Sequence, residues 1–160
     1  GIVAAQGTIE TFDHARMKRL LEINVLGALT VAREAARRLA KRNGGNGGAI
    51  VNVSSAAARL GSPNEYIDYA ASKGAIDTLT IGLSKELAGE GVRVNCVRPG
   101  IIDTDIHALG GMPDRVERLK DKLPMSRAGT AEEVAQPIIW LLSDEASYIT
   151  GALLDIAGGR

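Results

Sequence analysis

Three short apolar runs, separated by much longer stretches with helical spacing, restrict the fold of this chain more than any other feature. The runs cover residues 49–53, 92–97 and 152–156, and each begins directly after a glycine. Neighbouring parallel strands must be joined by a long crossover, usually a helix, so this alternation is typical of a parallel sheet. The chain is therefore predicted to form an α/β fold, and no internal repeat or linker divides it.

The helical stretches are indicated by apolar residues that recur every three or four positions. Residues 11–42 are predicted to form a helix with at most one break, which Gly27 favours, and a second helix is expected to end near residues 89–91. An S-x-x-E pattern at Ser62 and a T-x-x-E pattern at Thr130 predict that helices begin there, because such pairs cap the first turn.

Composition excludes several classes of function. The 19 basic and 19 acidic residues balance, so the chain lacks the positive charge that binds nucleic acid or an anionic membrane. No apolar stretch reaches the ~18 residues that span a bilayer, and a cytoplasmic protein is expected. The single Cys96 lies in a predicted strand and is expected to be buried. With only His14 and His107 as histidines, no metal site is expected.

Tyr69 and Lys73 form the clearest candidate for chemistry. They are four residues apart in a predicted helix, so their side chains lie over one another on one face. A free phenol has a pKa of ~10, and a neighbouring ammonium favours the phenolate. The pair fits a tyrosine that acts as a general acid or base. The spacing alone leaves open the alternative of an ordinary surface pair.

Polar residues at the ends of two predicted strands support a functional site. Ser54 and Ser55 follow the first strand, and Pro99 and Gly100 follow the second. Open α/β sheets bind their ligands at the carboxyl ends of the strands. Asn24 lies within an apolar helical stripe, where a buried amide without hydrogen-bond partners costs about 1 to 3 kcal/mol. Asn24 is therefore either satisfied structurally or kept for a task.

The glycine-rich segment 44–48 is only superficially like a phosphate-binding loop. It runs into the predicted strand at residues 49–53, whereas a phosphate cradle opens into the N-terminus of a helix. We therefore interpret the segment as a flexible connection between a helix and a strand.

Four motifs, taken in order along the chain, resemble the classical short-chain dehydrogenases/reductases. They are NVLG at residues 24–27, IVNVSS at 50–55, YAASK at 69–73 and RPGIIDT at 98–104. YITG at 148–151 and the glycines at 158–159 resemble the C-terminal end of that family. The resemblance implies a Rossmann-type doubly wound parallel sheet. Residues 1–160 would form the catalytic, C-terminal portion of a single NAD(P)-binding domain.

The resemblance also implies roles in interconverting an alcohol or sugar hydroxyl and a carbonyl with NAD or NADP. Tyr69 would exchange a proton with the substrate oxygen, and Ser55 would hydrogen-bond that oxygen. Lys73 would lower the pKa of Tyr69 and hold the nicotinamide ribose. Asn24 would position a water that links Lys73 to solvent. The residues that would line the nicotinamide are Pro99, Gly100, Ile102 and Thr104.

Two features of that family are missing from the sequence: the glycine-rich phosphate turn and the residue that selects between NAD and NADP. Such a chain is expected to be a C-terminal fragment with exposed sheet edges and uncovered apolar surface. By itself it should neither bind the dinucleotide tightly nor turn over. The resemblance further implies a small-molecule substrate and a homo-oligomer, either a dimer or a tetramer.

Several alternatives stay open at this point. Ser55 precedes Tyr69 by 14 residues, one more than in many relatives. Ser54 is therefore an alternative substrate-facing serine, because successive strand side chains point to opposite faces. Related epimerases and dehydratases share the Tyr-x-x-x-Lys pair, and a non-catalytic module for subunit contacts is a third interpretation. The irregular residues 103–128 are expected to shape the substrate pocket as a mobile loop with a short helix.

Overall fold

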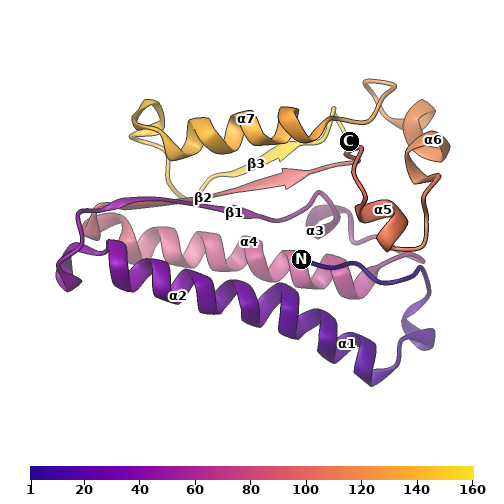
Figure 1. The fold of residues 1–160 in the computed structure, drawn as a ribbon, viewed down its shortest axis with the longest axis horizontal. Helices are drawn as coiled ribbons and strands as arrows, with labels where there is room; N and C mark the ends of the chain where they lie inside the picture. The colour runs from indigo at the N-terminus through magenta and orange to yellow at the C-terminus, as the bar shows by residue number, and fades with distance from the viewer.

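The computed structural model describes residues 1–160, which form a three-stranded parallel sheet covered by helices (Figure 1). The strands lie in the order β1 (Gly48–Val53), β2 (Val92–Pro99) and β3 (Leu153–Ile156). Both neighbouring pairs run parallel. The α/β fold with a parallel sheet is therefore confirmed.

Helices cover both faces of this sheet. On one face, α1 (His14–Leu21) runs through a π-helical turn (Glu22–Leu26) into α2 (Gly27–Leu39), and α4 (Ile67–Leu87) packs beside them against β2 (Figure 1). On the other face lies α7 (Ala131–Leu142). The helix predicted over residues 11–42 is shorter in the structure: it begins at His14, passes through the π-helical turn directly before Gly27, and ends at Leu39, because Ala40 is extended.

Short helices and turns connect these elements. In chain order they are Ile9–Thr11, Lys41–Asn43, α3 (Ala57–Leu60), Ala88–Glu90, α5 (Ile106–Leu109), α6 (Arg115–Leu119), Lys120–Lys122 and Asp144–Ala146. The glycine-rich segment 44–48 joins one such turn to β1, as predicted from the strand that follows it. None of the helices combines the length and the apolar character needed to cross a membrane.

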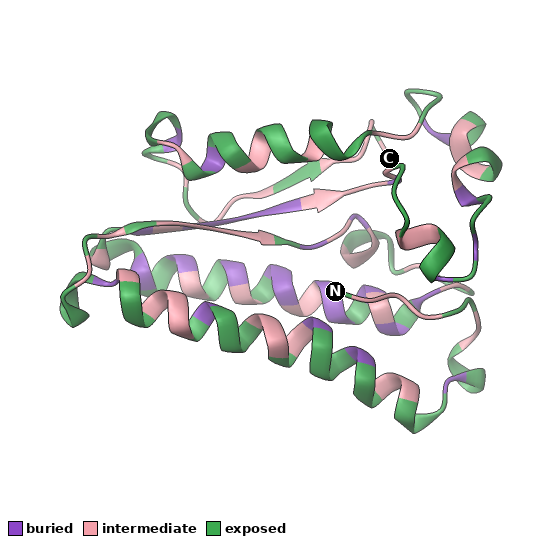
Figure 2. Ribbon diagram, in the orientation of Figure 1, coloured by how far each residue is buried: buried purple, intermediate pink, exposed green.

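Much of β2 is buried (Figure 2), and two clusters of buried apolar side chains form the core, one on each face of this strand. They are Ala40, Leu87, Val92 and Val94 on the α4 side, and Val97, Leu141 and Ala146 on the α7 side. Successive residues of a strand point to opposite faces, so β2 contributes to both clusters. Cys96 is also fully buried, as predicted.

The two predicted capping patterns have different outcomes. α7 begins with a complete capping box: the Thr130 hydroxyl accepts a hydrogen bond from the Glu133 N–H (3.2 Å), and the Glu133 carboxylate accepts one from the Thr130 N–H (2.9 Å). The prediction that a helix begins at Ser62 is wrong. Ser62 and Asn64 have left-handed backbone conformations (φ 46° and 60°), and α4 begins only at Ile67.

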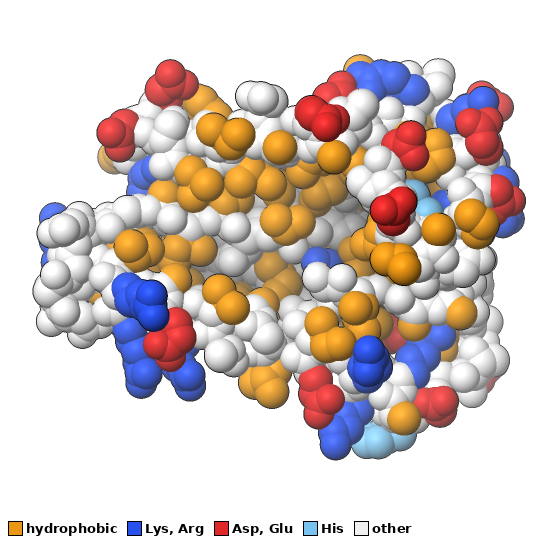
Figure 3. Space-filling view, in the orientation of Figure 1, with side chains coloured by type: hydrophobic (Ala, Val, Ile, Leu, Met, Phe, Trp, Pro, Cys, Tyr) orange, Lys and Arg blue, Asp and Glu red, His pale blue; other side chains and the backbone are white.

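β1 is an edge strand, because it pairs with β2 alone. On the face of the molecule that Figure 3 shows, apolar side chains form a band between α7 and α2. Val53 at the end of β1 is 48% exposed, Val31 on α2 is 70% exposed and Ile139 on α7 is 60% exposed. The expected combination of an open strand edge and uncovered apolar surface is therefore present.

Candidate functional site

A cleft of about 370 Å³ opens at the carboxyl ends of β1 and β2. All predicted site residues except Asn24 line it, namely Ser55, Tyr69, Lys73, Pro99, Gly100, Ile102 and Thr104. Half of the lining residues are hydrophobic, and none is an aspartate or glutamate. The cleft occupies the edge of the sheet at which open α/β folds bind ligands.

Tyr69 and Lys73 lie near the start of α4, and both side chains reach the cleft. The Nζ of Lys73 is 5.6 Å from the centroid of the Tyr69 ring. It also donates a hydrogen bond to the carbonyl of Val53, at the end of β1 (2.9 Å). This bond fixes the ammonium at the junction between the helix and the strand end, with the phenol beside it.

Burial sets the direction of both pKa values, because desolvation disfavours a charged group. Burial raises the pKa of Tyr69, and a hydrogen bond with Ser55 opposes that rise. Burial lowers the pKa of Lys73, against the opposite effects of Cys96 and Asp77. Desolvation of the phenol dominates, so the pKa of Tyr69 lies above its ordinary value, and the lowering expected from Lys73 stays a prediction. Tyr69 is consequently protonated at neutral pH and suited to donate its proton.

The two serines after β1 have different surroundings. Ser54 is 3% exposed, and its hydroxyl donates a hydrogen bond to the backbone carbonyl of Lys73 (3.0 Å). The Ser55 hydroxyl accepts a hydrogen bond from the N–H of Ala57 (3.1 Å), and it lowers the pKa of Tyr69. Ser54 therefore fastens β1 to α4, whereas Ser55 lies with the phenol. This difference favours Ser55 as the serine that meets a substrate.

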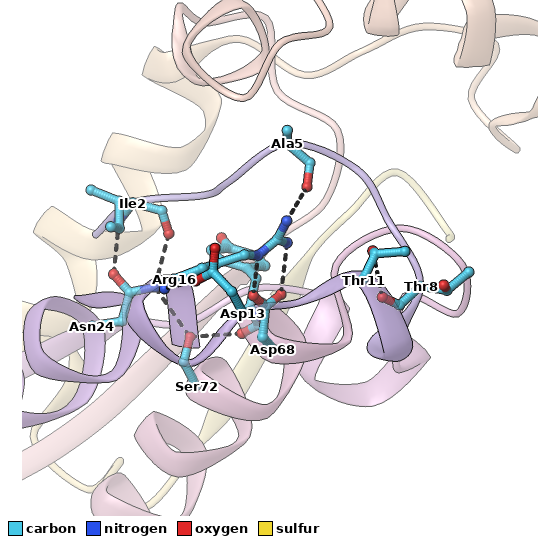
Figure 4. A network of polar contacts seen from close by, with 10 residues as sticks. Ile2, Ala5, Thr8, Thr11, Asp13, Arg16, Asn24, Asp68 and Ser72 are labelled. Carbon is cyan, nitrogen blue, oxygen red and sulfur yellow. Dashed lines mark hydrogen bonds and ion pairs between the residues drawn. The ribbon is translucent and has the colours of Figure 1, made fainter. Parts of the chain in front are cut away.

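Asn24 lies in the π-helical turn and is 4% exposed. Its Oδ1 accepts a hydrogen bond from the N–H of Ile2 (2.7 Å), and its Nδ2 donates to the carbonyl of Ile2 (2.9 Å) and to the hydroxyl of Ser72 (3.1 Å) (Figure 4). The amide thus joins the N-terminal segment, the π-helical turn and α4. Such turns are frequent at functional sites.

Asp68 is a contributor that the sequence analysis missed. Its carboxylate pairs with the guanidinium of Arg16 (2.8 Å) and accepts a hydrogen bond from the N–H of Tyr69 (2.9 Å). Arg16 also donates to the carbonyl of Ala5 (2.7 Å) (Figure 4). The pair holds α1 against the first turn of α4, where Tyr69 lies. An acidic residue in the first turn of a helix was the available signal.

The segment after β2 passes close to the end of β3. The Gly100 N–H donates to the carbonyl of Ile156 (2.9 Å), and a Cβ on Gly100 would lie 2.8 Å from the Cα of Ala157. Only glycine fits there. Farther along, the Ile102 carbonyl hydrogen-bonds with Nε2 of His107 (2.8 Å). Burial lowers the pKa of His107, so its ring is neutral at pH 7 and donates from Nε2.

Another part of the cleft wall was also missed. Tyr66 and Arg115 line the cleft. Arg115 pairs with Glu65 (2.6 Å), and the Tyr66 hydroxyl donates to the sulfur of Met112 (3.3 Å). The sequence analysis interpreted Glu65 as part of a helix cap. Its true partner is far away along the chain, so no local pattern could have identified the pair.

Comparison with known proteins places this site in context. A family model described as enoyl-(acyl carrier protein) reductase matches residues 1–160. The chain is 62% identical over 160 residues to an uncharacterized oxidoreductase, YgfF, of Escherichia coli K12. That match covers 100% of this chain and 65% of the relative.

Solved structures are also similar to this chain. A 3-ketoacyl-(acyl-carrier-protein) reductase from Brucella melitensis, complexed with NADH, is similar with a TM-score of 0.89 and 31% identity, over 100% of this chain and 64% of that one. A gluconate 5-dehydrogenase from Burkholderia cenocepacia, in complex with NADP and tartrate, has a TM-score of 0.88 and 28% identity, over 99% of this chain and 61% of that one. The chain thus spans a little under two thirds of each protein that it matches here.

Proposed function

The chain belongs to the short-chain dehydrogenase/reductase family, and we propose that it forms the catalytic part of an NAD(P)-dependent oxidoreductase. The reaction would interconvert an alcohol or sugar hydroxyl and a carbonyl. In this proposal, residues 1–160 are the catalytic portion of a single Rossmann-type domain. Two solved relatives were crystallised with NADH and with NADP, which supports the same class of cofactor here.

The lining of the cleft suits a nicotinamide and its ribose. Pro99 and Ile102 offer apolar surface to a planar ring, and Thr104 places a hydroxyl beside them. The ammonium of Lys73 and the absence of any carboxylate suit the ribose hydroxyls of an anionic dinucleotide. When bound, the nicotinamide supplies or accepts a hydride. The residues that we assign to it are Tyr69, Lys73, Pro99, Gly100, Ile102 and Thr104.

The residues of this chain handle the proton. In reduction, the Tyr69 hydroxyl donates its proton to the substrate oxygen, and the Ser55 hydroxyl donates a hydrogen bond to the same oxygen as negative charge develops there. In oxidation, the Tyr69 phenolate takes the proton of the substrate hydroxyl. The Lys73 ammonium favours the phenolate that remains after proton donation.

For Asn24 we propose an indirect role in moving that proton. The Oδ1 of Asn24 and the Nζ of Lys73 both border the backbone of Gly1: a Cβ built on Gly1 would lie 2.9 Å from the first atom and 3.4 Å from the second. The two polar groups therefore approach the same small region. A water held there would connect Lys73 to solvent.

One observation carries the proposal. A half-buried phenol, the hydroxyl of Ser55 and the ammonium of Lys73 converge in a single cleft at the carboxyl ends of two parallel strands. Packing alone does not require a protonated tyrosine to meet a serine and a lysine at that place. A site that transfers a proton does require such a set, namely a proton donor, a hydrogen-bonding partner and a nearby cation.

Replacement of Tyr69 by phenylalanine tests the proposal. In the full-length protein we expect Tyr69→Phe to lower the turnover of reduced nicotinamide with carbonyl substrates by at least about a hundredfold, because the general acid is lost. Absorbance of the reduced nicotinamide, with a panel of alcohols, sugars and their carbonyl forms, provides the measurement. Tyr148→Phe is the matched control, since Tyr148 is fully exposed, at 101%.

Retention of turnover by Tyr69→Phe would contradict the assignment and favour a scaffold role for α4. Net consumption of reduced nicotinamide also separates this proposal from an epimerase or dehydratase, in which hydride transfer is only transient. A product formed without net cofactor change would contradict the proposed reaction.

A further inference from the structure

The segment that contains α5 and α6 is fastened to the rest of the molecule by a partly buried ion pair. Arg115, at the start of α6, is 7% exposed. Its Nη2 lies 2.6 Å from Oε2 of Glu65, and its Nη1 lies 3.2 Å from Oε1. This two-pronged geometry makes an arginine–carboxylate pair both strong and directional.

Glu65 is a junction between three parts of the chain. Besides binding Arg115, its carboxylate accepts a hydrogen bond from the side chain of Gln6 (3.1 Å), and its backbone carbonyl accepts one from the N–H of Gly7 (3.0 Å). The residue also lies directly before Tyr66, which occupies the N-cap position of α4. The N-terminal segment, the start of α4 and the α6 segment therefore meet at one carboxylate.

Aromatic and sulfur contacts extend this junction into the cleft. The Arg115 guanidinium lies 5.1 Å from the centroid of the Tyr66 ring, within the range of a cation–π interaction. The Tyr66 hydroxyl donates to the sulfur of Met112 (3.3 Å), in the loop just before α6. Tyr66 and Arg115 both line the cleft. The ion pair therefore determines where one wall of the cleft stands.

The same segment has a second attachment, at α5. There Nε2 of His107 hydrogen-bonds with the Ile102 carbonyl (2.8 Å). His107 also lines the cleft, and its own carbonyl accepts a hydrogen bond from the N–H of Met112 (2.8 Å). The attachment at α5 ties the segment to the loop assigned to the nicotinamide. The attachment at Glu65 ties the other end of the α5–α6 segment to the start of α4.

We propose that Glu65 and Arg115 are positioning residues for the substrate, which hold the α5–α6 segment as the wall against which the substrate binds. This inference rests on the proposed function of the cleft. Neither residue takes part in proton transfer, and the nicotinamide residues belong to other segments. Loss of the pair therefore weakens substrate binding and leaves cofactor binding and proton transfer in place.

Kinetics of the full-length protein provide the first test. Because the pair is assigned to binding rather than to chemistry, Glu65→Gln is expected to raise the KM for the carbonyl substrate about tenfold, with kcat changed by less than about threefold. The Kd of the reduced cofactor should not move. The matched control is Glu117→Gln, which removes a solvent-exposed ion pair with Lys120 (2.6 Å) in the same segment. It should leave all three constants unchanged.

Two further variants distinguish positioning from general damage to the fold. Arg115→Lys keeps the charge but loses the two-pronged contact, and it should raise KM less than Glu65→Gln does. The exchanged pair, Glu65→Arg with Arg115→Glu, should recover most of the lost substrate affinity. If Glu65→Gln does not fold, Arg115→Lys and the exchanged pair decide the question. An unchanged KM in Arg115→Lys, or a fall in kcat without a rise in KM, overturns the proposal.

Limited proteolysis tests the attachment without reference to catalysis. Trypsin should cut after Lys122 faster in Glu65→Gln than in Glu117→Gln, because the segment is released from the start of α4. Equal cutting rates overturn the proposal even if the protein proves not to be an oxidoreductase. Faster cutting in a protein that turns over no alcohol or carbonyl would support the attachment and refute the proposed function separately.

Discussion

At the scale of single residues, Asn24 shows both the reach and the limit of sequence reasoning. Its place in an apolar stripe correctly indicated a buried amide that needs partners. Those partners are the backbone of Ile2 and the hydroxyl of Ser72, 22 and 48 residues away. No local pattern identifies partners at such separations, because tertiary packing alone brings them together.

Replacing Asn24 therefore affects stability as well as activity. We expect Asn24→Ala to lower the free energy of unfolding by about 1 to 3 kcal/mol, since the N–H and carbonyl of Ile2 lose their partner. Urea unfolding followed by circular dichroism measures this. Asn46→Ala, at an exposed position in the glycine-rich connection, is the control and should have little effect. Unchanged stability together with lost turnover would restrict Asn24 to the proton path.

The pKa of Tyr69 leads to a second prediction at this scale. The i, i+4 spacing correctly placed the phenol near Lys73, but the direction of its pKa depends on burial by segments far away in the sequence. Oxidation requires the phenolate, so its rate should rise with pH as Tyr69 ionises. The Ser55 hydroxyl lowers the pKa of Tyr69. Its removal in Ser55→Ala should therefore raise that pKa and move the rise in rate to higher pH.

The pH dependence of kcat/KM for alcohol oxidation is the measurement, with Ser54→Ala as the control. Ser54 donates to the backbone of Lys73 rather than to Tyr69, so its removal should leave the midpoint of the rise unmoved. A shift in Ser54→Ala with none in Ser55→Ala would reverse the assignment of the two serines.

At the scale of elements, two similar sequence patterns formed different structures. The pattern at Thr130 became a capping box, and bonds with Arg127 and the Thr130 N–H lower the pKa of Glu133 to about 2. The pattern at Ser62 became a turn, because the carboxylate of Glu65 binds Arg115 rather than the N–H of Ser62. Long-range charge pairing overrode a local preference, which is why the start of α4 was predicted too early.

The capping box at α7 can be tested directly. Thr130→Ala should destabilise the protein by about 1 kcal/mol, because the N–H of Glu133 loses its acceptor at the start of the helix. Thermal unfolding followed by calorimetry provides the measurement. Ser62→Ala is the comparison, since the Ser62 hydroxyl caps no helix. Equal losses in the two variants would mean that the box contributes nothing of its own.

At the scale of the whole molecule, the strand and helix order was predictable because each strand followed a glycine and because α2 and α7 carry apolar stripes. The open edge of β1 and the apolar band beside it were also expected. The shape of the cleft was not, since Tyr66 and Arg115 reach it through contacts that have no periodic signal. Periodicity predicts layers, whereas individual long-range pairs define the walls of a site.

The uncovered apolar band has a measurable consequence. We expect the isolated 160-residue chain to self-associate as its concentration rises, because an open strand edge beside exposed apolar side chains favours pairing. Sedimentation velocity over a range of concentrations checks this, and Val31→Lys should weaken association by replacing an exposed apolar side chain of α2 with a charge. A monodisperse monomer at all concentrations would contradict the expectation.

The register of the sheet also bears on how the molecule folds. Gly48 pairs with Val92 and Cys96 pairs with Leu153, so no two strands can join as a local hairpin. Each pairing must wait until an intervening helix has brought distant parts of the backbone together, which makes such topologies slow to assemble. During that delay α4 is the piece best able to form early, and the residues on its first turns would be arranged before the strands beneath them exist.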